Sequence, residues 1–241
     1  MNFDVAKIRF WEKRFWNTAN RVVAMSYSDK KIMRNLVPNL TVDLVPNGVD
    51  TEFFSHKERK KNNRKTVLFV GNFKWLQNRE AVTILVEKTW KVIKEKLPSA
   101  HLWIVGRFPP PEIKNLASSS ITVSSDVDDI RNAYKMSDVL LAPIYGPGGT
   151  RYKILEAMAA GVPVVTTKTG IEGLGAKRGV DAIIEENPEN LALETVGLLK
   201  DENLYNKLAL NGRKLVEKNF NWKSIAKNLD DIYQKATYVK N

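Results

Sequence analysis

The stretch GPGGTRYKILEAMAAGVPVV, residues 146–165, joins a glycine-rich loop to a short helix and then to an apolar strand. Gly148 and Gly149 allow the backbone to approach a ligand closely, because glycine has no side chain to interfere. Thr150 is a typical helix N-cap residue, so we expect a helix over residues 151–160. The stretch therefore predicts a helix N-terminus that follows directly on a glycine loop.

The rest of the chain indicates where this helix lies in the fold. Short apolar runs alternate with helical segments, and most of these runs are continuously apolar. Continuous runs are typical of parallel strands that helices cover on both faces. We therefore predict a doubly wound α/β domain, in which ligands bind at the carboxyl ends of the strands. The predicted strands are residues 21–26, 42–47, 66–72, 101–107, 121–125, 139–144, 163–167 and 181–185, and the predicted helices are residues 77–96, 129–137 and three segments within 188–238.

Two cations and one carboxylate follow the glycine loop. Arg151 and Lys153 fall in the first helical turn, where an exposed positive charge opposes the helix dipole at a cost of about 0.3–1 kcal/mol. A bound diphosphate would reverse that cost, and the alternative is two cations that face solvent. Glu156, one turn further on, either accepts hydrogen bonds from vicinal hydroxyls, as a ribose-binding acid does, or pairs with a basic neighbour at the surface.

The composition excludes several classes of protein. The chain has 241 residues, 43% of them hydrophobic, and no cysteine, so we expect a sizeable core and no thiol chemistry. No apolar run approaches the roughly 18 residues of a membrane span, and residues 1–16 mix charges with aromatics, unlike a signal peptide. His56 and His101 lie in no ligating or catalytic pattern, so no metal site is predicted.

The net charge of +11 favours an anionic partner. Three classes of anionic partner are a nucleic acid, a membrane surface and a phosphorylated ligand. The aromatic–basic pattern of an RNA-binding motif is missing, so we expect no nucleic acid. The N-terminal helix either lies on anionic lipid or packs against another protein domain, and we favour the second interpretation. Its aromatic and basic side chains are Phe10, Trp11, Phe15 and Trp16, beside Lys7, Arg9, Lys13 and Arg14.

Several segments together resemble the GT-B glycosyltransferases, in particular their large retaining family 4. Besides residues 146–165, the resemblance is carried by VPNGVDTEFF (45–54), VLFVGNFKW (67–75), LWIVG (102–106), SDVLLAP (137–143), TGIEGL (169–174) and FNWKSIAKNLDDIY (220–233). It covers about residues 20–236 and implies the Rossmann-like, donor-binding C-terminal half of a GT-B fold, with the N-terminal domain largely missing. We accordingly expect residues 1–50 to be a remnant of the N-terminal acceptor domain with the interdomain segment, residues 51–220 the nucleotide-sugar-binding domain and residues 221–241 a C-terminal crossover helix.

The resemblance also implies roles for individual residues. Glu156 would hold the ribose hydroxyls, and Gly148, Gly149 and Thr150 would line the donor sugar and diphosphate. The turn after the first long strand, Gly71 and Asn72, would approach the diphosphate. Further donor contacts would come from Arg107 and from the backbone of Asp126 and Val127.

This chain departs from the family pattern at the cationic positions. The pattern has an upstream glutamate where Gly148 stands, and an arginine and a lysine where this chain has Asn72 and then Gln77 or Asn78. We infer that the diphosphate cations have moved to Arg151 and Lys153, which with Glu156 form the predicted catalytic set.

The expected function is transfer of a sugar from a UDP- or GDP-linked donor to an acceptor, with retention, in polysaccharide or glycoconjugate biosynthesis. The resemblance implies no cofactor and no metal. A single chain of this extent is expected to be incomplete, so a partner chain with the N-terminal domain, or a homodimer, would complete it. The alternatives are half of a split enzyme or a non-catalytic GT-B-like module that docks on a membrane or a partner. We expect a cytoplasmic location, peripheral at the inner face of the membrane if the N-terminal helix binds lipid.

Overall fold

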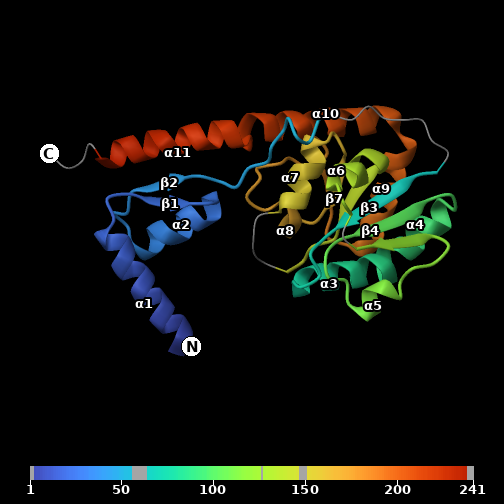
Figure 1. Ribbon diagram of the computed structural model, residues 1–241, viewed down its shortest axis with the longest axis horizontal. Coiled ribbons are helices and arrows are strands. Elements are labelled where there is room, and N and C mark those ends of the chain that lie inside the picture. The colour runs from blue at the N-terminus through green and yellow to red at the C-terminus, as the bar shows by residue number, and fades with distance from the viewer. Residues whose placement is uncertain (1–2, 56–63, 126, 147–150, 238–241) are drawn as a thin grey trace. The chain divides into compact units, whose positions relative to one another are not determined.

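The computed structural model describes residues 3–55, 64–125, 127–146 and 151–237 (Figure 1). It divides into two compact units, Met1–Gly48 with Asn219–Asn241, and Val49–Lys218. The sequence predicted divisions after residues 50 and 220. The predicted site residues all belong to the second unit, which is therefore described first.

A six-stranded parallel sheet forms the centre of the second unit. Its strand order is β5-β4-β3-β6-β7-β8. The chain first adds β4 and β5 on one side of β3, and then adds β6, β7 and β8 on the other side. The boundary between β3 and β6 is thus a topological switch point, where open α/β sheets bind their ligands. The strands are β3 (Thr66–Val70), β4 (His101–Val105), β5 (Ile121–Ser124), β6 (Val139–Ala142), β7 (Val164–Thr166) and β8 (Ile183–Ile184).

Helices cover both faces of this sheet. Because the strand order reverses at the switch point, right-handed crossovers place the helices of the two halves on opposite faces. Figure 1 shows α3, α4 and α5 on one side and α6 and α7 on the other, and α9 packs against α4, β6 and β7. The elements are α3 (Leu76–Ile84), the π-helical segment η1 (Leu85–Trp90), α4 (Lys91–Lys96), α5 (Pro111–Lys114), α6 (Ile130–Met136), α7 (Tyr152–Ala159), α8 (Lys168–Ile171), α9 (Pro188–Lys200) and α10 (Glu202–Asn219).

The continuous apolar runs are buried on both faces, as expected of covered parallel strands. Val67, Leu68 and Phe69 of β3 have no exposed surface, and neither has any residue of β6. The start of β3 is fixed by a buried carboxylate, since Asp138 Oδ2 accepts a hydrogen bond from the Thr66 amide at 2.8 Å. The predicted doubly wound α/β fold is therefore confirmed. The predicted helix over residues 77–96 is one helical run whose middle part, η1, is π-helical.

The N-terminal part of the first unit consists of a helix, a strand, a second helix and a second strand. Its two strands are parallel, with Val22 opposite Val42. Arg21 and Asp43 form a bidentate ion pair, with Arg21 Nε 2.7 Å from Asp43 Oδ2 and Arg21 Nη2 2.8 Å from Asp43 Oδ1. The last helix joins this unit, since Asn228 Nδ2 donates to the Leu44 carbonyl at 3.0 Å. The elements are α1 (Phe3–Thr18), β1 (Val22–Ala24), α2 (Tyr27–Leu36), β2 (Val42–Leu44) and α11 (Trp222–Thr237). Within the described ranges, no helix combines the length and the apolar character that crossing a bilayer requires.

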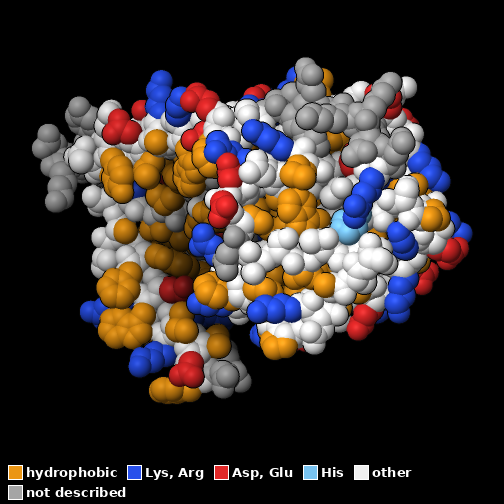
Figure 2. Space-filling model, turned by 45° about the vertical axis from the view of Figure 1, so that its right-hand side comes forward, with side chains coloured by type: hydrophobic (Ala, Val, Ile, Leu, Met, Phe, Trp, Pro, Cys, Tyr) orange, Lys and Arg blue, Asp and Glu red, His pale blue; other side chains and the backbone are white. Residues whose placement is uncertain are grey.

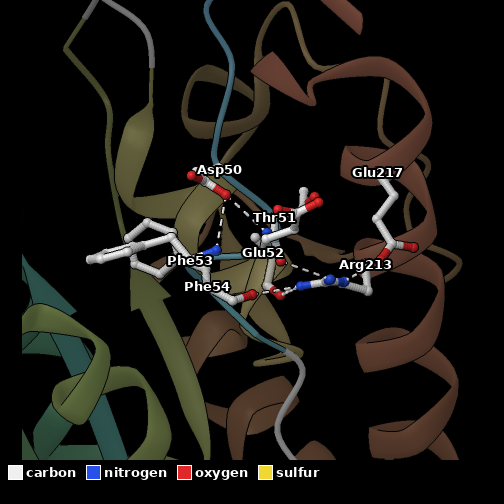
Figure 3. A network of polar contacts seen from close by, with 8 residues as sticks. Asp50, Thr51, Glu52, Phe53, Phe54, Arg213 and Glu217 are labelled. Carbon is white, nitrogen blue, oxygen red and sulfur yellow. Dashed lines mark hydrogen bonds and ion pairs between the residues drawn. The ribbon is translucent and has the colours of Figure 1, made fainter. Parts of the chain in front are cut away.

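One arginine holds the first residues of the second unit to α10 (Figure 3). Arg213, which is largely buried, donates to the carbonyls of Thr51 at 2.9 Å and Phe54 at 2.6 Å, and also to that of Ala159 at the end of α7. Its Nε donates to Glu217 at 2.6 Å. Three carbonyls from two distant segments therefore share one guanidinium.

Replacement of Arg213 by alanine should lower the free energy of unfolding by about 2–4 kcal/mol, because it leaves three backbone carbonyls without their charged donor. Urea denaturation measures this. Lys214→Ala, at an exposed position of the same helix, is the control and should change the stability by less than about 0.5 kcal/mol. Equal stabilities of the two variants would contradict the role given to Arg213.

Candidate functional site

The candidate site lies at the carboxyl edge of the sheet, beside the switch point. Because all six strands are parallel, the segments that follow β3, β4 and β6 emerge at this same edge. Gly71 follows β3, Gly106 follows β4, and Gly146 ends the described part of the segment after β6. The first two approach so closely that a Cβ atom on Gly106 would lie 1.6 Å from the Gly71 carbonyl oxygen. Only glycine fits at Gly106, which fixes the distance between the two turns.

Two threonine hydroxyls at the end of the neighbouring strand β7 fix the segment after β6 by hydrogen bonds. Thr166 Oγ1 donates to the Ala142 carbonyl at 2.7 Å, and Thr167 Oγ1 donates to the Ile144 carbonyl. A Cβ atom on Gly146 would lie 2.9 Å from Gln77 Cγ of α3. The segment that leads to α7 therefore runs close against the first turn of α3.

Arg151 is the N-cap residue of α7, so the predicted N-cap at Thr150 is wrong by one position. Its side chain does not cap the helix but turns back, and Nη2 donates to the Gly146 carbonyl at 2.9 Å. Burial lowers the pKa of the Arg151 guanidinium, while the charge of Glu172 acts in the opposite direction. The guanidinium is thus held at the Gly146 carbonyl.

Lys153 lies in the first turn of α7, as predicted, but it does not face solvent freely. Its ammonium donates to Asn78 Oδ1 at 2.6 Å and lies 4.5 Å from the centre of the Phe69 ring. Asn78 is oriented by a second bond, since its Nδ2 donates to the Asn72 carbonyl at 2.7 Å. Burial, together with the charge of Arg151, lowers the pKa of Lys153 to about 7. A neighbouring anion would be needed to hold the full positive charge at neutral pH.

Glu156 lies one turn further along α7 and is partly buried. Its Oε2 accepts a hydrogen bond from the Tyr134 hydroxyl of α6 at 2.8 Å. Burial raises the pKa of Glu156, whereas the Tyr134 hydrogen bond and the charge of Lys153 oppose that rise. The alternative of a surface glutamate paired with a basic neighbour does not describe this carboxylate.

The other predicted residues are only partly brought together. Asn72 Oδ1 caps the following turn by accepting from the Lys74 amide at 3.0 Å, and the exposed Arg107 contributes its carbonyl to the Phe73 amide at 3.0 Å. Val127 is half-buried between β5 and α6. Four predicted residues lie outside the described part of the chain, namely Asp126, Gly148, Gly149 and Thr150.

Three residues of the site were not among the predicted ones. Phe69 and Tyr134 are buried aromatics of β3 and α6, and nothing in their sequence neighbourhood distinguishes them from other core residues. Asn78 could have been suspected from the sequence, because it stands near the position at which the resembled family pattern has a lysine. His101, in contrast, only bonds Thr122 Oγ1 at 2.8 Å on the neighbouring strand. Among the described residues, no His, Asp and Glu side chains form a group of three or more that could hold a metal ion.

A groove of about 510 Å³ borders the site along α3. It is lined by residues of α3 and α5, among them Glu80 and Glu112, and by Tyr145 and Gly146 after β6. Arg151, Lys153 and Glu156 do not line it. The groove and the charged site are therefore separate features that meet at Gly146.

Comparison with known proteins assigns the class. A family model described as glycosyl transferases group 1 matches residues 64–201, which is more than half of the chain. The chain therefore belongs to the group 1 glycosyltransferase family, and the predicted GT-B resemblance is confirmed.

Individual proteins agree with this assignment. An uncharacterized glycosyltransferase of Methanocaldococcus jannaschii is 26% identical over 241 residues, covering 92% of this chain and 60% of that protein. The solved structure of sucrose-phosphate synthase from Thermosynechococcus elongatus has a TM-score of 0.77 at 21% identity, covering 96% of this chain and 62% of that one. The structure of Anabaena HepE in complex with UDP and glucose has a TM-score of 0.73 at 18% identity, covering 90% and 64%. This chain thus spans less than two thirds of the length of each of these proteins, and the structural likeness shows the Rossmann-like half of the GT-B fold.

Replacement of Lys153 by methionine should stabilise the protein without ligand by roughly 1–3 kcal/mol near neutral pH, because it removes a buried cation. The pKa of Lys153 is about 7 when folded against an ordinary value of 10.5, so between these values the unfolded chain binds a proton that the folded chain lacks. Wild-type stability should therefore rise with pH across this interval, and the advantage of the variant should shrink toward its upper end.

Urea denaturation from about pH 6 to about pH 10 measures the difference. Lys207→Met, at an exposed position of α10, is the control and should show no such pH-dependent gain. A Lys153→Met protein less stable than wild type at every pH would mean that the ammonium is well compensated.

Proposed function

We propose that this chain binds a nucleotide-diphosphate sugar at the N-terminus of α7 and serves as the donor-binding half of a glycosyltransferase. The observation that carries the proposal is the pair of cations there, since Arg151 and Lys153 crowd a helix end that is already electropositive. Membership in the group 1 family supports it, and HepE was solved with UDP and glucose.

A diphosphate would balance the positive charge that Glu156 and Glu172 compensate only in part. The low pKa of Lys153 means that the amine is only partly charged at neutral pH, and a neighbouring anion would raise that pKa again. Arg151 would exchange its bond to the Gly146 carbonyl for phosphate oxygens, which a guanidinium binds in a two-pronged geometry. The loop glycines Gly148 and Gly149 would let the donor approach the backbone.

In the reaction, these groups would stabilise the departing nucleoside diphosphate. As the bond between the anomeric carbon and the diphosphate oxygen breaks, negative charge develops on that oxygen, and two preorganised cations and a helix N-terminus lower its energy. Glu156 would accept hydrogen bonds from the ribose hydroxyls and so hold the nucleotide. We propose transfer with retention of the anomeric configuration, by the family resemblance, without a metal or further cofactor.

Titration calorimetry with UDP, GDP and their hexose conjugates tests the proposal. The protein should bind one nucleotide series, and Arg151→Ala and Glu156→Gln should each weaken that binding about tenfold or more, which corresponds to loss of a charge-assisted hydrogen bond. Arg178→Ala, which removes an exposed arginine paired with Glu185, is the control and should leave the affinity unchanged. No binding by the wild-type protein, or equal binding by all variants, would refute the proposal.

The helix α1 supports a second proposal, that the first unit docks on another protein domain. None of its described residues is buried, and Phe10, Trp11 and Phe15 are 60%, 44% and 64% exposed. Figure 2 shows hydrophobic side chains interspersed with charged ones at the lower left, where α1 lies. The apolar residues of α1 are not gathered on one face, whereas a helix that lies on a membrane separates its faces. An N-terminal acceptor domain, in the same protein or a partner chain, fits this surface better than lipid or a second copy of the chain does.

Co-sedimentation with phosphatidylglycerol vesicles tests whether α1 binds a membrane or another protein domain. Only weak binding that disappears at about 150 mM salt is expected, because the net charge of +11 attracts the protein without inserting it. A Trp11→Ser, Phe15→Ser double variant should bind the vesicles equally. Salt-resistant binding that this variant loses would instead establish a peripheral membrane protein, the location predicted if α1 meets lipid.

A further inference from the structure

A chain of contacts leads from Arg213 to the carboxylate of Glu156. Arg213 Nη1 donates to the Phe54 carbonyl at 2.6 Å, and the Phe54 ring meets the Tyr134 ring edge-on, with centres 5.8 Å apart. The Tyr134 hydroxyl then donates to Glu156 Oε2 at 2.8 Å. Residues from α10, from the segment before β3 and from α6 thus form a chain of contacts that ends at the Glu156 carboxylate of α7.

The segment that carries Phe54 is rigidly folded (Figure 3). Asp50 Oδ1 accepts hydrogen bonds from the amides of Glu52 at 3.0 Å and Phe53 at 2.9 Å, and the Asp50 carbonyl accepts from the Phe54 amide at 3.0 Å. Arg213 closes this turn from the other side through the carbonyls of Thr51 and Phe54. Phe54 itself is only 8% exposed, so its ring has a fixed place against Tyr134.

Tyr134 is held equally firmly. It has no exposed surface, and the helix α6 that carries it begins at Asp129, whose side chain accepts from the Arg131 amide. The Arg131 guanidinium lies 4.1 Å from the centre of the Phe53 ring, which ties α6 to the same segment. The Tyr134 hydroxyl has a single proton to donate, and the nearer of its two acceptors is Glu156 Oε2, since the Lys153 carbonyl is 3.3 Å away.

We infer that Tyr134, seated by Phe54, is the positioning residue for ribose recognition by Glu156. Its hydroxyl holds one carboxylate oxygen in place, and the second oxygen is the one assigned to the ribose hydroxyls. Both roles rest on the proposed binding of a nucleotide sugar. Neither Tyr134 nor Phe54 touches the nucleotide in this scheme, and they act only through the orientation and the ionisation of Glu156.

The ionisation of Glu156 distinguishes a positioning role of Tyr134 from a purely structural one, because a purely structural residue would not change the pKa of Glu156. The groups that act on Glu156 in the described structure are Lys153 on its own helix and Tyr134 from α6, with Arg151 acting on Lys153. Burial raises the pKa of Glu156, and the Tyr134 hydrogen bond lowers it because it stabilises the ionised form. Without the hydroxyl the pKa of Glu156 rises further. At a given acidic pH, a larger fraction of the protein then carries a protonated Glu156. A protonated carboxyl group accepts fewer hydrogen bonds from the ribose hydroxyls.

The experiment compares UDP with 2′-deoxy-UDP and 3′-deoxy-UDP, or the guanosine series if the wild-type protein prefers GDP, in wild type and Tyr134→Phe. The variant keeps the ring and removes only the hydroxyl. The preference of the wild type for the ribonucleotide should fall roughly tenfold in the variant. The pH at which ribonucleotide affinity declines should also move upward, because the Tyr134 hydrogen bond no longer lowers the pKa of Glu156. Phe54→Leu should reproduce both changes in weaker form, and it carries the test if Tyr134→Phe does not fold.

Tyr205→Phe, which alters a buried tyrosine of α10, is the matched control and should leave the ribose preference unchanged. A Tyr134→Phe protein with wild-type preference and pH dependence overturns the inference, provided that Glu156→Gln abolishes the preference. If Glu156→Gln also leaves it unchanged, the assignment of Glu156 to the ribose fails, and the inference fails with it. If the wild-type protein binds none of these nucleotides, the proposed function itself fails.

Discussion

The parallel pairing of β3 with β6 is the constraint on which the candidate site depends. These two strands begin the two oppositely directed halves of the sheet, and they are neighbours although about seventy residues of chain separate them. Their pairing brings the first turn of α3 next to Gly146, which follows β6, and next to the first turn of α7. The bond from Lys153 to Asn78 spans this boundary, and it exists only because the sheet has this strand order.

The electrostatics of the site follow from that arrangement. A lysine over the Phe69 ring and beside Arg151 is poorly solvated and repelled, which is why the pKa of Lys153 lies near neutrality. Glu156 compensates only in part, because burial raises its own pKa. The ammonium comes from α7, and Asn78 of α3 accepts its hydrogen bond at 2.6 Å.

The segment 49–55 connects the site to the rest of the second unit. It packs through Phe54 on Tyr134 and through its carbonyls on Arg213, so it belongs to the support of Glu156 as well as to the fold. The first unit contributes a two-stranded parallel sheet and a helix, α1, whose described residues are not buried. The chain spans less than two thirds of the length of the three proteins compared with it.

The sequence by itself determined the fold class, the order of the elements and the family. Continuous apolar runs such as VLLA of β6 are typical of strands covered on both faces. The glycine-rich sequence after this run predicted a helix N-terminus at the carboxyl edge of the sheet. Arg151 and Lys153 could be singled out as candidates because cations in that place are unfavourable without an anion, and Glu156 because its position resembles that of a ribose-binding acid. Only the tertiary structure decided the partners of these residues. Tyr134, Phe54 and Asn78 come from distant parts of the chain and have the ordinary periodicity of core or surface positions, so their contacts arise from strand order and packing, which local sequence patterns do not encode.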